Sequence, residues 1–336
     1  MTLMDLLPAS FSHRREGSKA RKNNPCTTTT IFSHRSVLAP EVVDFLQPKK
    51  GKVILDGTLG GGGHAELLLQ AGATVIGCDR DPEALAHASE RLAEFGERFT
   101  TLEGNYLEAD MLLAERGIKS LDGVLLDLGV SSYQLDRAER GFSFQREGPL
   151  DMRMGNSGQT AADIVNTAEL SELVHIFREY GEEPRAMTMA TRIVRERLRH
   201  PITTTLQLAT LIAAGMPSGP RHPATRIFQA LRISVNEEIT SLERALPRLT
   251  QLLEPGGRIA IITFHSLEDR LVKQFFKKHA AAEIDDPTWP APKPNPEHLF
   301  SLPKNWSVRA STEEIANNPR SRSARLRLAE RFQPSF

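Results

Sequence analysis

The chain has 336 residues, 40% of them hydrophobic, which is enough for one large domain or two ordinary ones with a sizeable core. Its 42 Lys and Arg residues balance 42 Asp and Glu residues, so a net charge of +0 excludes a global attraction to nucleic acid and leaves only local basic patches. Two cysteines exclude a disulfide framework and a zinc site, and no apolar run reaches the roughly 18 residues of a membrane span, so we expect a cytoplasmic protein.

Residues 1–32 differ in composition from the rest. A charged run at 13–22 and a threonine tract at 27–30 predict a disordered basic tail. A transit peptide, against which Asp5 and Glu16 count, and a polyanion-binding arm stay open as alternatives. His34 and Arg35 follow, and they either line a substrate entrance or form an exposed lead-in to a helix that begins near Pro40.

A strand, a glycine loop and a helix come next. The apolar residues 53–55 predict a buried strand that ends at Asp56, and four glycines at 60–63 precede a predicted helix at 65–70. Glycines let the backbone approach a ligand, and the start of a helix offers free N–H groups. The next strand, at 74–78, ends at Asp79, which can accept hydrogen bonds from ribose hydroxyls. This series favours a nucleoside-cofactor site over a flexible surface loop.

A Rossmann dehydrogenase shares such a series. However, Asp56 would repel a pyrophosphate, and the spacing of the glycines is not a clean G-x-G-x-x-G. Asp56, Gly57 and the glycine cluster look like motif I of S-adenosylmethionine methyltransferases, with Asp79 as the ribose acid.

Two further strands extend the predicted sheet. The strand at 99–102 leads to Tyr106, which either stacks on an adenine or is an ordinary core or surface tyrosine. The strand at 124–126 ends at Asp127. Ligands of open α/β sheets bind at the carboxyl ends of the strands, so we expect Asp56, Asp79 and Asp127 to line one edge.

From about residue 136 the alternation of strand and helix stops. Helices are predicted at 160–165, 170–180, 185–198 and 204–214. The predicted fold class is therefore α/β, a Rossmann-like methyltransferase sheet with an inserted all-helical domain. We expect the tail at 1–32, the sheet domain at 33–136 and 235–332, and the insertion at 137–234, as an RNA-substrate domain. Arg192, Arg195 and Arg199 share one helix face, which is either solvated or in contact with an RNA backbone.

The rest of the chain returns to the sheet. A single long helix is predicted from residue 222 to about 249, unless Pro247 kinks or ends it early. A turn at 254–257, a strand at 258–263, a helix as far as Lys278 and a proline-rich irregular segment at 285–305 follow. A last strand at 323–330 is expected to pair with 306–310. His265 and Asp269 either touch RNA or belong to an ordinary loop. A second basic cluster is formed by Arg320, Arg322 and Arg325.

Seven motifs together resemble the bacterial 16S ribosomal RNA cytosine-N4 methyltransferase H family, RsmH, also called MraW. They are residues 56–64 (DGTLGGGGH), 125–132 (LLDLGVSS), 140–144 (RGFSF), 148–154 (GPLDMRM), 222–226 (HPATR), 262–270 (ITFHSLEDR) and 318–323 (NPRSRS). The resemblance covers about residues 33–332.

The resemblance implies S-adenosyl-L-methionine as methyl donor. It implies as acceptor the N4 atom of a decoding-region cytosine of 16S rRNA, within the small ribosomal subunit or its assembly intermediate. The cofactor contacts that it implies fall on Gly61, Gly62, Gly63, His64, Asp79, Tyr106, Asp127 and Gln134. No metal and no membrane are implied. The oligomeric state is not fixed by the sequence, and a homodimer is compatible with it.

Methyl transfer to cytosine N4 requires an acceptor for the hydrogen bonds of the amino group, which localises the nitrogen lone pair. Asp127, or the backbone at 128–131, is the candidate for this catalytic role. Methylation at C5 would instead require a thiolate, whereas Cys26 lies in the tail and Cys78 inside a strand. Two rivals remain, namely an NAD-linked oxidoreductase and an RNA-binding chaperone that keeps the fold without turnover.

Overall fold

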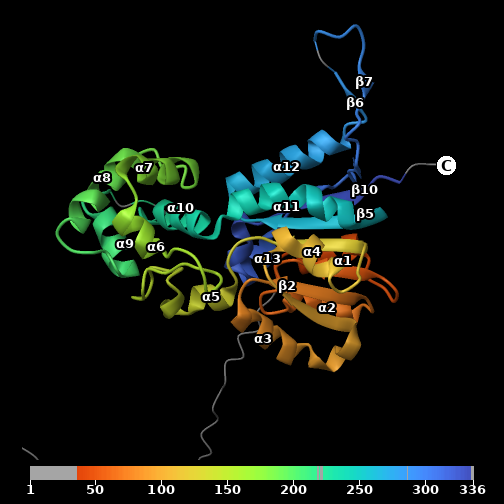
Figure 1. Ribbon diagram of the computed structural model, residues 1–336, viewed down its shortest axis with the longest axis horizontal. Coiled ribbons are helices and arrows are strands. Elements are labelled where there is room, and N and C mark those ends of the chain that lie inside the picture. The colour runs from red at the N-terminus through yellow and green to blue at the C-terminus, as the bar shows by residue number, and fades with distance from the viewer. Residues whose placement is uncertain (1–35, 218, 220–221, 286, 334–336) are drawn as a thin grey trace, which may run out of the picture. The chain divides into compact units, whose positions relative to one another are not determined.

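The computed structural model describes residues 36–217, 219, 222–285 and 287–333 (Figure 1). The predicted tail at 1–32, together with His34 and Arg35, lies outside these residues. No helix in the part of the chain that is described has the length and apolar character to span a membrane.

A central sheet runs in the order β3-β2-β1-β4-β5-β10-β8, and β9 pairs with β10 off this path. Strands β1 to β5 are parallel, and β10 lies antiparallel to β5. The sheet strands are β1 (Val53–Asp56), β2 (Thr74–Asp79), β3 (Phe99–Glu103), β4 (Leu121–Asp127), β5 (Leu253–Thr263), β8 (Phe300–Ser301), β9 (Ser307–Arg309) and β10 (Arg325–Arg331). Strands β6 (Glu283–Ile284) and β7 (Lys293–Pro294) form a separate hairpin that projects from the sheet in Figure 1.

The helices fall into those that flank the sheet and those of the predicted insertion. The first set is α1 (Ala39–Leu46), α2 (Gly63–Gln70), α3 (Pro82–Arg91), η1 (Ala93–Arg98), η2 (Tyr106–Glu108), α4 (Ala109–Ala114), α11 (Glu238–Leu252), α12 (Ser266–Ala280), α13 (Thr312–Asn317) and η4 (Pro319–Ser323). The second set is α5 (Ser132–Asp136), η3 (Ala138–Arg140), α6 (Ala161–Thr167), α7 (Leu170–Glu179), α8 (Ala186–Arg197), α9 (Thr205–Ala213) and α10 (Thr225–Asn236).

The sheet is covered on both faces, as its short apolar strands require. Neighbouring residues of a strand point to opposite faces. Accordingly, Ile54 packs with α1, α2 and α3, while Leu55 packs with α4, α11 and α12. The polar strand ends are left as the part of the sheet that can receive a ligand.

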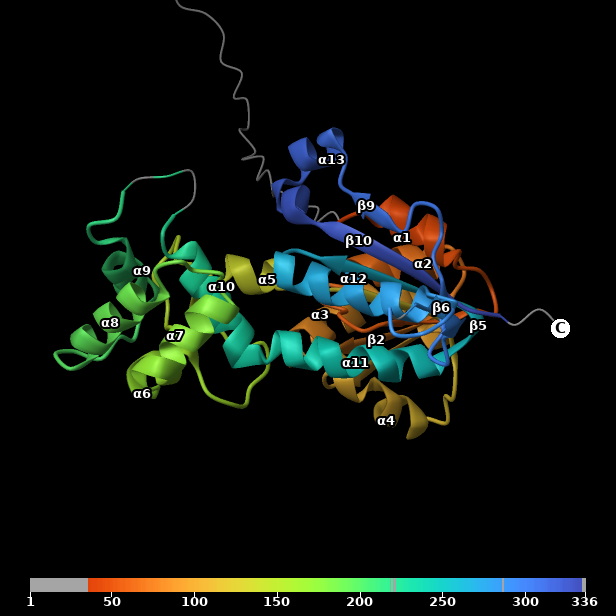
Figure 2. The same ribbon diagram turned by 90° about the horizontal axis from the view of Figure 1, so that it is seen from above.

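The helical segment has a hydrophobic core of its own. Buried residues of α6 to α10, among them Phe177, Ile193 and Leu231, form one cluster separate from the two on the sheet. Figures 1 and 2 show α6 to α9 gathered to one side of the sheet, with α10 leading back toward α11. Capping boxes at Thr160 and Thr204 begin α6 and α9 where the sequence predicts helices to start.

Three expected elements differ from the structure. The single long helix is wrong, because Glu237 adopts a left-handed conformation (φ 51°) that separates α10 from α11. Pro247 lies inside α11, which continues to Leu252. The expected turn at 254–257 is an irregularity within β5, where the register against β4 shifts between Leu121 and Gly123. The segment at 285–305, which is expected to be irregular, contains the short strands β7 and β8. The pairing of β9 with β10 is confirmed.

Candidate active site

Three acidic side chains stand at the carboxyl ends of adjacent parallel strands. Asp56 ends β1, Asp79 ends β2 and Asp127 ends β4. Asp56 is level with Gly77 of β2 and Leu125 of β4, so the other two acids extend two residues further along the same edge. The structure thus brings together the three strand ends that the sequence predicts.

The glycine loop lies against this edge. Gly60 donates its backbone N–H to Asp79 Oδ2 at 2.8 Å, which ties the loop to the end of β2. Gly62 has a φ of +77°, a backbone conformation that would be strained in a residue with a side chain. A Cβ added at Gly61 would meet nothing within 4 Å, so the backbone there faces open space that a ligand can approach closely.

Asp56 is buried, with 1% of its surface exposed. Burial raises the pKa of Asp56 to about 7, against the opposing effects of His64 and of the Thr58 N–H. That N–H lies 3.3 Å from Asp56 Oδ1. A cation placed beside Asp56 would favour its ionised form.

His64, in the first turn of α2, faces Asp127. Its Nε2 lies 3.6 Å from Asp127 Oδ2, too far for a hydrogen bond. Burial alone disfavours the charged ring, but the Asp127 and Asp56 carboxylates outweigh it and raise the pKa of His64. Within the described residues, both ring nitrogens of His64 and Asp127 Oδ1 are buried without a hydrogen-bond partner. Buried polar atoms of this kind are typical of a site that binds a ligand.

Asp79 is held by backbone donors. Burial raises its pKa, while the N–H groups of Asp81 and Gly60 oppose the rise. The Asp81 N–H donates to Asp79 Oδ1 at 3.0 Å. The second oxygen of Asp79 accepts from the Gly60 N–H, so the Asp79 carboxylate is fixed in orientation at the rim of the glycine loop.

Tyr106 begins η2 and lies close to β1. A Cβ at Gly57 would come within 3.1 Å of the Tyr106 Cβ, so the aromatic residue flanks the end of that strand. Burial raises the pKa of its phenol, and the carboxylates of Glu238 and Glu268 add to the rise. The ring therefore stays neutral and can offer its face or edge to a planar base.

Gln134 lies in α5 and is 4% exposed. Its Oε1 accepts from the Ser131 N–H at 3.0 Å in a capping box, and its Nε2 donates to Asp81 Oδ2 at 3.0 Å. Asp81 therefore connects Gln134 to the sheet edge that carries Asp56, Asp79 and Asp127, here named the cofactor edge. The role of Gln134 as a direct cofactor contact stays a prediction.

A cleft of about 1150 Å³ opens beside this edge. Its walls are the loop after α7, the start of α10, the loop after β5 and the segment at 319–325. Arg185, Arg226, Arg322 and Arg325 line it together with Phe264 and His265. A Cβ at Gly129 would lie 3.5 Å from Phe264, so the loop after β4 meets the cleft at that point.

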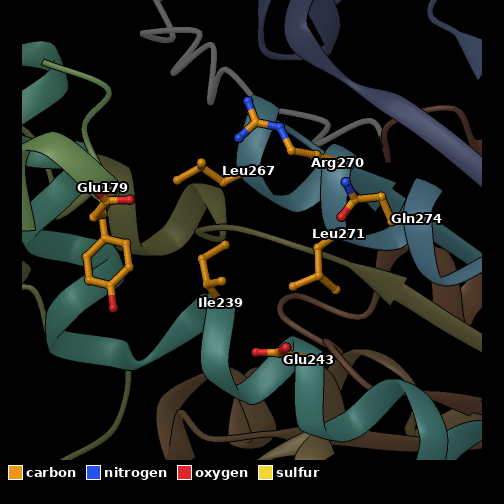
Figure 3. Close-up of a pocket in the computed structure, with 8 residues that line it drawn as sticks. Glu179, Ile239, Glu243, Leu267, Arg270, Leu271 and Gln274 are labelled. Atoms are coloured by element: carbon orange, nitrogen blue, oxygen red, sulfur yellow. The ribbon is translucent and has the colours of Figure 1, made fainter. Parts of the chain in front are cut away.

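A smaller pocket of about 270 Å³ lies elsewhere, between the end of α7 and the helices α11 and α12. Figure 3 shows Ile239, Leu267 and Leu271 around it, with Arg270 and Glu243 at its margins. None of its lining residues stands at the carboxyl end of a sheet strand, whereas Thr263 and Phe264 of the larger cleft stand at the end of β5. The smaller pocket is therefore separate from the proposed chemistry.

Glu238, His265 and Glu268 bring possible metal-ligand atoms within 4.8 Å of one another. Both Glu238 oxygens, however, accept hydrogen bonds from Arg232, at 2.8 and 2.7 Å. Glu268 is buried; His265 and Arg232 outweigh its burial and lower its pKa. Since Arg232 and the α12 capping box already balance these carboxylates, the group is explained as an ion-pair network at the helix start.

Three polar residues near the site have no role that the sequence predicts. Asp81, Arg140 and Asn236 are hydrogen-bonded around the cofactor edge. Asp81 before Pro82 carries a recognisable helix-start signal, because Asp at the N-cap and Pro at the first helical position are typical. Arg140 begins the motif at 140–144 (RGFSF), which by itself gives this residue no role, and Asn236 has no local signal.

Comparison with known proteins reveals close relatives. A model of the MraW methylase family matches residues 31–332. A ribosomal RNA small subunit methyltransferase H from Syntrophotalea carbinolica is 52% identical over 313 residues, covering 91% of this chain and 100% of the relative. The protein of the same name from Trichlorobacter lovleyi is 50% identical, with 90% and 99% covered.

Among solved structures, an rRNA methylase from Streptococcus thermophilus aligns with a TM-score of 0.39 and 12% identity. It covers 87% of this chain and 95% of that one. A likeness of this size carries no argument on its own. The family match and the relatives at half identity, each spanning most of the chain, are decisive: the chain belongs to the MraW methylase family.

Proposed function

We propose that this protein transfers a methyl group from S-adenosyl-L-methionine to N4 of a decoding-region cytosine in 16S rRNA. The observation that carries the proposal is the edge formed by Asp56, Asp79 and Asp127. Beside it lie the His64 nitrogens, which have no partner among the described residues, and the open backbone at Gly61. Relatives at half identity bear the name of a small-subunit rRNA methyltransferase, which supports the substrate class.

The residues present fit this cofactor. Asp79 would accept from the ribose hydroxyls, Tyr106 would flank the adenine, and residues 61–63 would let the backbone approach. Asp56 and His64 would lie against the charged amino acid end, with Gln134 supporting the site through Asp81. When bound, the cofactor supplies an activated methyl group on a sulfonium, which needs no metal to leave.

Asp127 is the candidate for contacting the cytosine that accepts the methyl group. Its Oδ1 is buried and has no hydrogen-bond partner among the described residues. Its backbone N–H donates to Thr58 Oγ1 at 2.6 Å, which fixes the position of the residue at the strand end. The Asp127 side chain as a whole is 26% exposed, so its carboxylate can accept from the cytosine amino group and direct the nitrogen lone pair toward the methyl donor.

Chemistry at cytosine C5 is disfavoured by the same geometry. It would require a cysteine thiolate as nucleophile. Burial raises the pKa of Cys78 to about 12, so this cysteine stays a thiol at neutral pH. Its Sγ also points to the Gly104 carbonyl at 3.4 Å.

We infer further that the helical segment at 137–234 and the 1150 Å³ cleft beside it bind the RNA. Arginines from both walls suit the phosphate backbone, and Phe264 leads toward the edge that holds Asp127. The face of α8 that carries Arg192 and Arg195 is less suited to binding RNA than its spacing suggests. Arg192 already donates to the Ala214 and Ile212 carbonyls. Arg195 stays exposed there.

Two experiments test this function. Adenosylhomocysteine should raise the melting temperature and NAD should not; stabilisation by NAD alone would favour the oxidoreductase. Purified enzyme should transfer labelled methyl to small subunits from a deletion strain, and mass spectrometry of the nucleosides should identify N4-methylcytidine. Absence of transfer by the native protein would favour the RNA chaperone, and equal transfer by Asp127→Ala would remove Asp127 from catalysis.

A further inference from the structure

Asp81 is a buried carboxylate, 1% exposed, next to the ribose acid. Its Oδ1 accepts from the Glu83 N–H at 3.1 Å. Its Oδ2 accepts from Gln134 Nε2 at 3.0 Å and from Arg140 Nη1 at 2.8 Å. Because the Asp81 N–H in turn donates to Asp79, any change at Arg140 reaches the cofactor edge through a single residue.

Arg140 also holds a second part of the chain. Its Nη2 donates to the backbone carbonyls of Arg153, at 3.2 Å, and Met154, at 3.0 Å. The planar guanidinium therefore binds a carboxylate on one side and a loop on the other. An ammonium group, as a point charge, does not reproduce this two-sided geometry.

The same loop is bound by the end of α10. Asn236, 2% exposed, accepts from the Met154 N–H at 2.8 Å and donates to the Met152 carbonyl at 2.8 Å. Arg80, which follows Asp79 directly, donates to the Asn236 carbonyl at 2.9 Å. The next residue is Glu237, where the left-handed backbone separates α10 from α11.

A closed chain of hydrogen bonds thus runs from the glycine loop through Asp79, Asp81 and Arg140 to Asn236. It connects the cofactor edge to the point where the helical segment joins α11. A ligand that fixes one end of such a chain alters the free energy of arranging the other end.

We propose that Arg140 is a positioning residue that couples cofactor binding to RNA binding. The proposal rests on the proposed function, because it takes the helical segment and its cleft as the RNA site. The partners of Arg140 are Asp81 and the loop at 152–154, so its effect on either ligand would pass through them. Arg140 acts by holding the loop at 152–154 in one arrangement relative to Asp81, so that each ligand binds more tightly when the other is present.

The test compares five proteins: native, Arg140→Lys, Asn236→Ala, the double variant that carries both changes, and the control Arg137→Lys. Arg137 lies in the same turn, but its side chain is 42% exposed and faces Glu83 and the Tyr133 ring. For each protein, calorimetry gives the affinity for adenosylhomocysteine alone. Filter binding to small subunits, with and without adenosylhomocysteine, gives the coupling factor. Melting temperatures establish that each variant is folded.

We expect adenosylhomocysteine to tighten RNA binding by about tenfold in the native protein, within the usual range of such couplings. Arg140→Lys and Asn236→Ala should reduce this factor to below about twofold, while affinity for adenosylhomocysteine alone changes by less than about threefold. The double variant should show no further loss. The control should keep the native factor.

A native factor of one, or a factor unchanged in both variants, would overturn the proposal. So would a loss of adenosylhomocysteine affinity with the coupling intact, because that result would give Arg140 a purely local role. These outcomes are distinct from failure of the proposed function, in which native protein would bind no adenosylhomocysteine or would not methylate small subunits.

Discussion

Asp56 shows how one buried charge makes stability depend on pH. Its pKa is about 7 in the folded protein, above the usual value for an unfolded carboxyl. Between about pH 4 and pH 7 the unfolded chain has therefore lost a proton that the folded protein retains. The free energy of unfolding must fall over this window as pH rises, and Asp56 has no further effect above it.

The first prediction is that Asp56→Asn flattens this pH dependence. For a shift of this size, Asp56 alone should lower the free energy of unfolding of the native protein by about 4 kcal/mol between pH 4 and pH 8. Urea unfolding of native protein and variant across that range measures the difference. The raised pKa of His64 gives a loss in the same direction, so part of the slope should persist in the variant. Identical slopes in both proteins would contradict the assignment to Asp56.

A second prediction compares two adjacent glycines. Gly61→Ala should change stability by less than about 0.5 kcal/mol, because its Cβ enters open space, but should weaken adenosylhomocysteine binding at least about tenfold. Gly62→Ala should cost about 1 to 2 kcal/mol, because its φ is +77° and its Cβ would lie 3.0 Å from Leu92. Thermal unfolding and calorimetry separate the two effects. Unchanged affinity in Gly61→Ala would move the cofactor away from this loop.

At the scale of elements, the sequence predicts best what short-range forces decide. Helices α6 to α9 begin and end close to the expected residues, since apolar periodicity and threonine caps are local signals. The acids at the strand ends were predicted for the same reason. The break between α10 and α11 at Glu237 could not be predicted. No glycine marks it, and Asn236 is held there by a loop far away in sequence.

The break at Glu237 gives the third prediction. Glu237 is exposed and holds φ at 51°, so Glu237→Gly should raise the free energy of unfolding by about 0.5 to 1 kcal/mol. Arg244→Gly, at an exposed position inside α11, should instead lower it by about 1 kcal/mol. Chemical denaturation of the two variants checks the opposite signs. Destabilisation by both would mean that Glu237 makes a contact that outweighs its backbone strain.

At the scale of the whole molecule, function depends on surfaces from distant parts of the chain. The cleft takes its basic residues from the helical segment and from residues 319–325, which the sheet brings together. Spacing along one helix suggested Arg195 as an RNA contact, whereas a cleft that joins α10 to the segment before β10 has no local signature. Only the folded chain reveals which arginines face the same space.

The fourth prediction therefore compares Arg322→Glu with Arg195→Glu. Both residues are exposed. If the cleft holds the RNA backbone, Arg322→Glu should weaken binding to small subunits about tenfold and reduce the salt dependence by about one phosphate contact. Arg195→Glu should have less than a threefold effect, and adenosylhomocysteine affinity should be native in both. A larger effect at Arg195 would place the RNA on α8.

The antiparallel strand β10 has a consequence for synthesis. It pairs with β5 over six positions, from Arg325↔Thr263 to Glu330↔Arg258, and is the last of the described strands to leave the ribosome. Strands β1 to β4 have been translated long before β5 finds this neighbour. The nascent chain therefore exposes one apolar edge of a half-built sheet until β10 has been translated, which makes the interval before β10 emerges the period of greatest need for a chaperone.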